Sequence, residues 1–537
     1  MRQETSNFFD WRTIVAILLV GATFIGWQSY MQRKYPQAFK KQEIVEKDTG
    51  DAAKSAGALN QTPVKDEALA TTVEAAAKAQ QPEQLILFES ETLSFQLSSR
   101  GMGLKDLHLR KYTDRKGEIV KLGVPGDGVL PLETRLMGQA QPLDFNMERI
   151  NANMFVGRAR IGALEVTKTL EFQPDLYSVR AKLSVSGRDQ RFVGLSTALV
   201  DRVEGNGKGG FFSPSYEQQE FFVEEADAED RVTLGQEEIR KSWSKVQLAS
   251  LGSQYFTQAV VDHSPIMPEA KGVLNPKEKS AEILLQYPAL NQSENFQLDF
   301  TAFLGPKSYY LLKQVNEELP KVVDFGFFNW IGRHILSMLQ WFHSLVGNWG
   351  VAIILLTILV RFLVLPFNLY SYKSMRAMQM IQPQIQALRE RHKDDQQKQQ
   401  QEMLQLMREN RVNPVGGCLP VLLQFPIFIA LYQVLGHSIE LYQAPFMLWI
   451  NDLSLKDPYY ILPVLMGLTM FIQQKITPHT MDPAQAKVML MMPLIFTFFM
   501  VSLPSGLTLY MLVGAIFSVL QQLYFMKDSK PTLAGAK

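Results

Sequence analysis

Hydrophobic positions are distributed unevenly along this 537-residue chain, and changes in their pattern divide it into parts. An apolar run from Ile14 to Trp27 is followed by a polar, Ala-rich stretch over residues 36–84. Residues 85–310 then alternate between apolar and polar positions, and long apolar runs follow after residue 325. The mean hydropathy of −0.05, which alone suggests a soluble protein, therefore averages a polar front and an apolar back.

The first apolar run fits either a cleaved signal peptide or a membrane anchor. The residues behind it, such as Trp27, Tyr30 and Met31, are bulky and offer no small-residue cleavage site. The run is short for a span, which takes about 17–25 residues, yet the missing cleavage site favours an uncleaved signal anchor. The segment that follows has almost no aromatic residues and cannot bury enough apolar surface to offset its ordering entropy. We expect it to be a disordered linker.

Short alternating runs from residue 85 onward predict β-strands. Leu93-Phe95-Leu97 and Tyr177-Val179-Ala181-Leu183-Val185 alternate with a period of two. Breaks rich in Gly and Pro, such as residues 123–131, separate the runs. Because about 225 residues of short strands suit one domain, we expect a large antiparallel β-sandwich.

The apolar part begins with an amphipathic segment. Asn329, Arg333 and Ser337 recur at four-residue steps, with apolar side chains on the other face. Such a helix lies either in a membrane interface or on the surface of the β domain, and its place directly before an apolar run favours the interface. Five further apolar runs follow, at Trp349–Tyr370, Pro420–Leu435, Tyr459–Ile472, Val488–Leu503 and Gly506–Phe525. Together with the anchor they predict six transmembrane helices.

Lysine and arginine in the short loops predict the orientation. Residues 371–416 hold eight of them, whereas residues 438–457 hold only Lys456. This alternation places both termini in the cytoplasm and the β domain outside, so we expect a multi-pass membrane protein. If the cell is Gram-negative, the outside is the periplasm and the membrane is the bacterial inner membrane. The predicted segments are a cytoplasmic N-terminus (1–12), the first transmembrane helix (13–30), the linker (31–84), the β domain (85–318), the amphipathic helix (319–345), the second transmembrane helix (346–370), a cytoplasmic helical hairpin (371–416), the third transmembrane helix (417–437), a periplasmic loop (438–457), the fourth transmembrane helix (458–474), a cytoplasmic loop (475–487), the fifth (488–503) and sixth (505–526) transmembrane helices and a cytoplasmic tail (527–537).

The predicted hairpin has apolar residues at helical spacing on two arms. The first arm carries Met375, Met378, Ile381, Ile385 and Leu388, and the second carries Met403, Leu406 and Met407. The polar residues Lys393-Asp394-Asp395 form a turn between them. This hairpin is either a solvated spacer or a docking surface for a cytoplasmic partner.

One basic residue, Arg361, lies inside the second predicted span. It follows Trp349 by twelve residues and precedes Tyr370 by nine, which puts it about 13 Å from the cytoplasmic end of the span. An arginine at this depth costs at least about 2.5–3.5 kcal/mol, and either snorkelling or a wet cavity lowers that cost. No acidic residue occurs inside any predicted span, so a cavity there favours a transient anionic guest. The residues expected to line such a cavity beside Arg361 are Thr357, Gln424, Phe428, Gln433, Thr497, Ser505, Tyr510 and Gln521.

No motif for enzymatic chemistry accompanies this site. One cysteine, Cys418, and seven dispersed histidines exclude a disulfide framework and the usual metal-ligand spacings. Residues 205–210 resemble a phosphate loop only loosely, and Ser242-Trp243-Ser244-Lys245 matches S-x-x-K without its partner motifs. The net charge of +1 argues against a dedicated nucleic-acid binder. We therefore expect no catalytic residue, metal or cofactor, and no direct nucleic-acid readout.

Several motifs in the apolar part resemble the YidC/Oxa membrane protein insertase family. The strongest likeness, to the family's third span, is carried by Asn413-Pro414-Val415-Gly416-Gly417-Cys418-Leu419-Pro420 and Gln424-Phe425-Pro426-Ile427-Phe428-Ile429-Ala430-Leu431-Tyr432. It continues in Ala444-Pro445-Phe446, Trp449-Ile450, Asp452-Leu453-Ser454, Asp457-Pro458-Tyr459-Tyr460-Ile461-Leu462-Pro463 and Pro504-Ser505-Gly506-Leu507. The arginine of the second span matches as well. The likeness covers residues 325–526, and the anchor with a large β domain resembles the Gram-negative bacterial form.

The resemblance implies a five-helix insertase core whose hydrophilic groove contains Arg361, opens to the cytoplasm and lipid, and is closed toward the periplasm. It implies a periplasmic β-supersandwich related to sugar mutarotase folds. It also implies that the protein inserts nascent membrane proteins and helps them fold, alone or with the Sec translocon, in contact with membrane lipids. A ribosome or targeting factor would bind the hairpin. The tail departs from the family's long basic tails, since only twelve residues with three lysines follow Phe525.

Two other functions stay open on the residues alone. The first is secondary transport through the same groove, which the absence of inverted repeats and intramembrane carboxylates disfavours. The second is an envelope enzyme that acts through the β domain. Deletion of residues 90–310 would abolish the function of such an enzyme and leave an insertase with much of its own.

Overall fold

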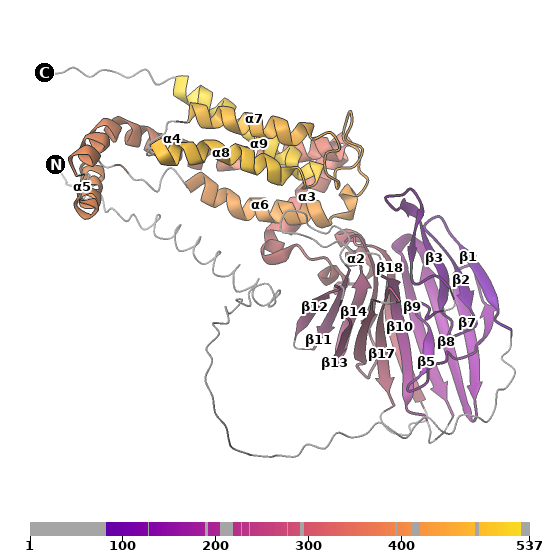
Figure 1. The fold of residues 1–537 in the computed structure, drawn as a ribbon. Helices are drawn as coiled ribbons and strands as arrows, with labels where there is room; N and C mark the ends of the chain where they lie inside the picture. Colours follow the sequence, from indigo (N-terminus) through magenta and orange to yellow (C-terminus); the bar gives the residue numbers. More distant parts are fainter. Residues whose placement is uncertain are drawn as a thin grey trace, which may run out of the picture.

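The computed structural model describes residues 82–527, except for residues 127, 188, 190–191, 204–218, 227, 236, 277, 290–294, 393–394, 411, 413–418 and 478–482. The predicted first transmembrane helix and most of the linker and tail lie outside the described residues, as do Cys418 and the glycine-rich loop at 205–210. Figure 1 shows a β domain at one end of a set of elongated helices.

The strands of the β domain form three antiparallel sheets. The four-stranded sheet contains, in spatial order, β1 (Leu85–Glu89), β2 (Leu93–Ser98), β3 (Leu104–Thr113) and β4 (Ile119–Leu122). The five-stranded sheet contains β13 (Ile239–Trp243), β16 (Glu269–Asn275), β17 (Ser280–Pro288), β10 (Gly194–Arg202) and β5 (Thr134–Leu136). The nine-stranded sheet contains β12 (Glu229–Thr233), β11 (Glu220–Glu225), β14 (Val246–Gly252), β15 (Phe256–Asp262), β18 (Asn295–Pro306), β9 (Ser178–Ser186), β8 (Leu164–Gln173), β7 (Met154–Ile161) and β6 (Asn146–Arg149). The predicted antiparallel β-sandwich is confirmed.

The alternating residues form the core between these sheets. On β9 the apolar positions are buried and the polar positions between them are exposed, as expected for a strand with one face inward. Four aromatic rings pack together in the interior, with Phe95 and Phe172 centroids 4.7 Å apart and Phe88 and Phe95 centroids 4.8 Å apart. Burial of these rings is the main force that holds the sheets together.

One lysine, Lys168, occupies an inward position of β8 and is completely buried. Its ammonium nitrogen lies within hydrogen-bond distance of four oxygen atoms: Leu132 O at 2.6 Å, Gly101 O at 2.9 Å, Thr134 Oγ1 at 3.0 Å and Met102 O at 3.2 Å. Burial lowers the pKa of Lys168 to about 7. The charged end of this side chain thus ties three main-chain segments together inside the sandwich.

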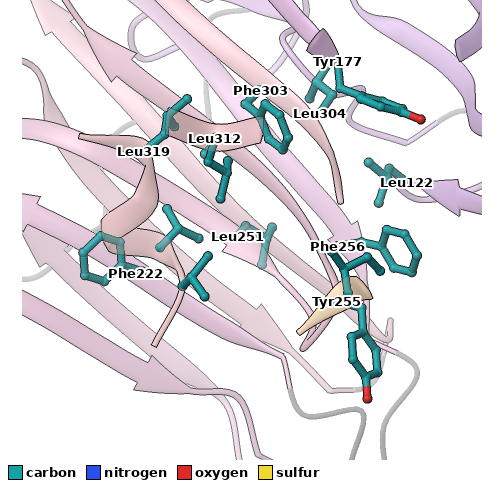
Figure 2. Packing of buried hydrophobic residues seen from close by; sticks show 14 of the residues in the cluster. Leu122, Tyr177, Phe222, Leu251, Tyr255, Phe256, Phe303, Leu304, Leu312 and Leu319 are labelled. Carbon is teal, nitrogen blue, oxygen red and sulfur yellow. The ribbon is translucent and has the colours of Figure 1, made fainter. Parts of the chain in front are cut away.

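The chain that leaves the last strand stays on the β domain before it reaches the membrane part. The short helix α2 (Tyr309–Val315) places Leu312 on the nine-stranded sheet, and Leu319 follows; both are fully buried. Figure 2 shows these two side chains beside Phe303 of β18. Residues 309–322 are therefore part of the β domain's packing.

Seven further helices follow in the described part of the chain. They are α3 (Asn329–Val346), α4 (Trp349–Arg391), α5 (Gln396–Glu409), α6 (Leu419–His437), α7 (Ile461–Ile476), α8 (Pro483–Met500) and α9 (Ser505–Lys527). The amphipathic helix α3 begins later than the predicted bound of 319. Pro320 lacks an amide donor and Gly326 has a φ of +70°, so residues 319–328 form short 3₁₀ turns instead.

Helix α4 does not end at the predicted bound of 370. It continues for 43 residues, about 65 Å, which exceeds the thickness of a bilayer. Helix α5 folds back on its far end, and Met378, Ile381, Ile385 and Met407 are buried between the two. The Asp395 carboxylate accepts from the amide of Lys398 and caps α5. Figure 1 shows α5 at the end of the helices away from the β domain.

By length and composition, two of the described helices suffice to cross a membrane: Trp349–Arg391 and Ser505–Phe525. Three shorter apolar helices, at Leu422–His437, Ile461–Ile476 and Leu490–Met500, lie with them. The predicted count of six transmembrane helices stays a prediction.

Candidate functional site

Arg361 projects from α4 toward α9. Its Nη1 donates a hydrogen bond to Oγ of Ser518, at 2.9 Å. The Ser518 hydroxyl in turn donates to the carbonyl of Gly514, one turn earlier on α9, at 3.0 Å. A hydroxyl has one proton and two lone pairs. Because its proton is engaged by Gly514, the oxygen of Ser518 can turn its lone pairs to the guanidinium.

Gly514 lies directly against the arginine. A Cβ atom on this residue would be 2.4 Å from Nη2 of Arg361 and 3.1 Å from both Cζ and Nε. Real Cβ atoms do not approach other heavy atoms this closely. The guanidinium therefore occupies space that any other residue at position 514 would fill.

Other polar residues continue this interface along the helices. Tyr510 is completely buried one turn before Gly514, and its hydroxyl accepts from Nε2 of Gln424 on α6, at 3.2 Å. At the other end, Nδ2 of Asn368 donates to Oε1 of Gln521, at 3.2 Å, and both residues are buried. Polar side chains from α4, α6 and α9 thus follow one another between helices that are otherwise apolar.

Thr357 and Phe428 lie on the same helices as this cluster. Thr357 is completely buried one turn before Arg361, and its hydroxyl donates to the Ile353 carbonyl of its own helix, at 2.6 Å. Phe428 is half-buried on α6, one turn after Gln424, and packs against the apolar core. The hydroxyl of Thr357 thus bonds within its own helix, and the hydrogen bond recorded for Arg361 is the one to Ser518.

The structure places three other expected site residues elsewhere. Ser505 begins α9, about 20 Å along the helix from Ser518, and donates to the Asp452 carbonyl. Thr497 on α8 donates to Pro493 of its own helix, at 2.8 Å. Gln433 lies beside Gly326, near the start of α3. None of these three side chains reaches the Arg361 cluster.

Arg361 has little internal compensation for its charge. A guanidinium offers five N–H donors. In the described part of the chain the hydrogen bond to Ser518 is the one that it makes, and its buried Nε has no acceptor. No carboxylate among the described residues lies within ion-pair distance of it. Such an arginine can bind a carboxylate or another anion in the geometry that guanidinium groups favour.

Gly514, Ser518 and Asn368 were missed by the analysis of the sequence. The available signal was spacing, because Tyr510, Gly514 and Ser518 recur every four residues and therefore share one face of a helix. Asn368 follows Arg361 by seven residues, again on the same face. A role for such small, uncharged residues cannot be predicted until it is known which helix packs against them.

At the β-domain end, the loop before α7 closes over the helices. The amides of Ser505 and Gly506 donate to the carbonyls of Leu455 and Leu453, at 2.6 and 3.0 Å. The ring of Phe446 packs on Gly350, where an added Cβ would lie 2.0 Å from the ring. These contacts join the first turns of α4 and α9 to the loop.

Metal chemistry has no support in the described residues, where no group of three or more His, Cys, Asp or Glu side chains could hold an ion. The observed parts are a β-sandwich, long apolar helices and an arginine, Arg361, between α4 and α9. Two family profiles match this chain: one described as "60Kd inner membrane protein" over residues 341–532 and one described as "YidC periplasmic domain" over residues 85–338. Together with the fold, they define an inner-membrane protein with a periplasmic β domain.

Curated relatives identify the family. A membrane protein insertase YidC of Geobacter metallireducens is 32% identical over 542 residues, covering 96% of this chain and 98% of the relative. The YidC of Nitrosococcus oceani is 38% identical over 383 residues, covering 68% of this chain and 67% of the relative. The chain belongs to the YidC family of membrane protein insertases, as its motifs indicate. Because these relatives are named insertases, the expectation that the chain is not an enzyme is confirmed.

Two solved structures are similar to parts of this chain. A crystal structure of an active YidC insertase with its first transmembrane domain resolved is 19% identical, covers 84% of this chain and 94% of that chain, and has a TM-score of 0.39. A galactose mutarotase-like protein from Lactobacillus casei is 14% identical, covers 41% of this chain and all of that chain, and has a TM-score of 0.29.

Proposed function

We propose that this protein inserts newly made proteins into the inner membrane, and that Arg361 attracts acidic residues in the polar tail of each client. The observation that carries this proposal is the guanidinium between α4 and α9, which has one hydrogen bond and no carboxylate partner among the described residues. A cation kept at this depth costs free energy. Transient binding of anionic segments is a function that repays that cost.

The physical problem is the hydrocarbon layer, about 30 Å thick, that a polar tail must cross. A hydrophilic groove around Arg361, open to the cytoplasm and lipid, shortens the dry part of this path. Two unit charges about 4 Å apart interact by about 4 kcal/mol at an effective dielectric constant of 20 and by about 1 kcal/mol in water. Closure toward the periplasm is supported by the contacts of Phe446 with Gly350 and of the loop with the start of α9.

The hydrophobic segment of the client then moves into lipid. Large apolar side chains are exposed on three of the helices, namely Phe362 and Phe367 on α4, Leu494 and Phe498 on α8, and Leu520 and Tyr524 on α9. Each apolar side chain that leaves water gains about 1.5–3 kcal/mol, so a segment of some twenty residues needs no nucleotide hydrolysis at this step.

The orientation and partners complete the proposal. Both termini and the α4–α5 hairpin lie in the cytoplasm, the β domain lies in the periplasm, and six helices cross the membrane. The hairpin docks a ribosome or targeting factor, and the protein acts alone or with the Sec translocon as an insertase and chaperone. Contact with lipids is supported by α3, whose Trp330, Trp341 and Leu345 are exposed on one helix.

Insertion by the purified, full-length protein in liposomes tests this proposal. The clients are a protein with an acidic N-terminal tail and the same protein with each Asp and Glu of the tail replaced by Asn and Gln. Arg361→Glu should slow insertion of the acidic client by at least about tenfold, because each 1.4 kcal/mol is a factor of ten, and should slow the neutral client much less. Lys475→Glu, on α7, is the matched charge control. Equal insertion of the acidic client by Arg361→Glu and the wild type would remove the electrostatic role.

A further inference from the structure

The Arg361 guanidinium lies against Gly514, a residue of α9 that carries no side chain. The three heavy atoms nearest to a Cβ built on Gly514 are Nη2, Cζ and Nε of Arg361, at 2.4, 3.1 and 3.1 Å. No neighbouring backbone or core side chain is nearer. The absence of a side chain on Gly514 therefore serves the arginine rather than the packing of one helix on another.

We propose that Gly514 is a positioning residue for the insertase: its missing side chain lets the guanidinium lie flat on α9, where Ser518 fixes it in one orientation. This inference rests on the proposed role of Arg361 in attracting acidic tails. Ser518 completes this site, since its hydroxyl donates a hydrogen bond to the Gly514 carbonyl and its oxygen accepts one from Nη1 of Arg361. One turn of α9 thus supplies both the space and the acceptor.

A glycine in the middle of a helix has a cost that supports this role. Glycine is less favourable than alanine by about 1 kcal/mol in a helix interior, because the flexible backbone loses more entropy. Alanine at 514 would be the better helix former. The atoms that it would displace belong to the mobile end of a long side chain, so Gly514→Ala should fold and leave the backbone of α9 in place.

The displaced guanidinium should lose the orientation in which Ser518 holds it. Moving a charge from about 4 to about 6 Å from a client carboxylate, at an effective dielectric constant of 20, weakens binding of that carboxylate about tenfold, which corresponds to a loss of about 1.4 kcal/mol in interaction energy. A purely structural defect would slow all clients alike. Loss of the fixed guanidinium orientation should slow insertion of the client with an acidic tail and leave insertion of its neutral-tailed version unchanged.

The test measures insertion of both clients by the full-length protein in liposomes. Gly514→Ala should slow the acidic client about tenfold and the neutral client not at all. Gly436→Ala, on α6, is the matched control, since an added Cβ there meets nothing within 4 Å. Equal slowing of both clients by Gly514→Ala, or unchanged insertion of the acidic one, would overturn the proposal.

A second background sharpens the result. Lysine ends where the Cζ of arginine lies and has no Nη2, so the clash at 2.4 Å disappears. Adding Gly514→Ala to an Arg361→Lys variant should therefore change nothing, a non-additivity that is expected of residues in contact. If Gly514→Ala slows the acidic client equally in both backgrounds, it does not act through the guanidinium.

A crystal structure of the Gly514→Ala variant separates this inference from the proposed function. If Arg361→Glu inserts both clients normally, the function proposed for the arginine fails, whatever Gly514 does. The positioning claim still requires that the guanidinium has left Ser518 in the variant. A guanidinium that keeps its hydrogen bond to Ser518 beside an alanine would overturn it.

Discussion

The buried lysine of the β domain permits a quantitative prediction. Replacing Lys168 by methionine keeps a long apolar side chain but removes every donor. The Gly101 carbonyl still accepts from the Thr134 amide, at 2.9 Å, whereas the carbonyls of Leu132 and Met102 lose the donor that Lys168 supplies. A buried carbonyl left without a partner costs about 1–3 kcal/mol. Because the variant no longer buries an amine, part of this cost is offset, and we expect the free energy of unfolding of the β domain to fall by about 3 kcal/mol.

Hydrogen exchange at the amides of β8 measures this loss in the full-length protein, without reference to the helices. These amides lie in the core of the nine-stranded sheet and exchange through opening of the domain. A loss of about 3 kcal/mol should speed their exchange by about 100-fold. Lys182→Met, on the neighbouring strand, is the control, because its side chain is 58% exposed and its ion pair with Asp299 spans 4.0 Å. Exchange of β8 in Lys168→Met within threefold of this control, which is about 0.7 kcal/mol, would refute the reasoning.

Further predictions concern pH, the hairpin and the client path. The pKa of Lys168 is about 7 in the folded protein and 10.5 ordinarily, so the unfolded state binds more protons between these values. The free energy of unfolding should therefore rise with pH from about 7 to 9 in the wild type but not in Lys168→Met. Hydrogen exchange, corrected for the pH dependence of the intrinsic exchange rate, measures this difference. Ile385→Asp puts a carboxylate into the buried contact between α4 and α5 and should strip α5 of exchange protection while β8 keeps its own; protected α5 amides would contradict that packing. A photoreactive side chain at Gln424 should crosslink to a ribosome-held nascent membrane protein, whereas one at the exposed Ile150 of the β domain should not, and the reverse pattern would place the client path elsewhere.

Features with a local cause could be predicted from the sequence. The alternation at residues 177–185 becomes β9, Ser178–Ser186, because side chains of a strand point to opposite faces in turn. Arg361 was found because a charge inside an apolar run is costly wherever its neighbours lie. The Tyr510–Gln424 contact joins two polar residues that were both expected near it.

Features that depend on which helix faces are opposed could not be predicted. Thr497 and Ser505 are polar residues in or beside spans, yet their hydroxyls bind Pro493 and Asp452 rather than anything near Arg361. Gly514 has no chemistry of its own, and its importance appears only when α4 is placed against α9. Lys168 breaks the inward apolar pattern of β8, and its four oxygen neighbours come from segments more than thirty residues away.

Exchange of charge between Arg361 and its client tests the central claim most directly. An Arg361→Glu insertase in liposomes is given a client whose acidic tail residues are replaced by lysine, and insertion is compared with that of the acidic client. If the site acts by charge, the reversed pair should insert at least about tenfold faster than the acidic client does with the same variant, since repulsion becomes attraction. Equal insertion of the two clients by Arg361→Glu would contradict the account.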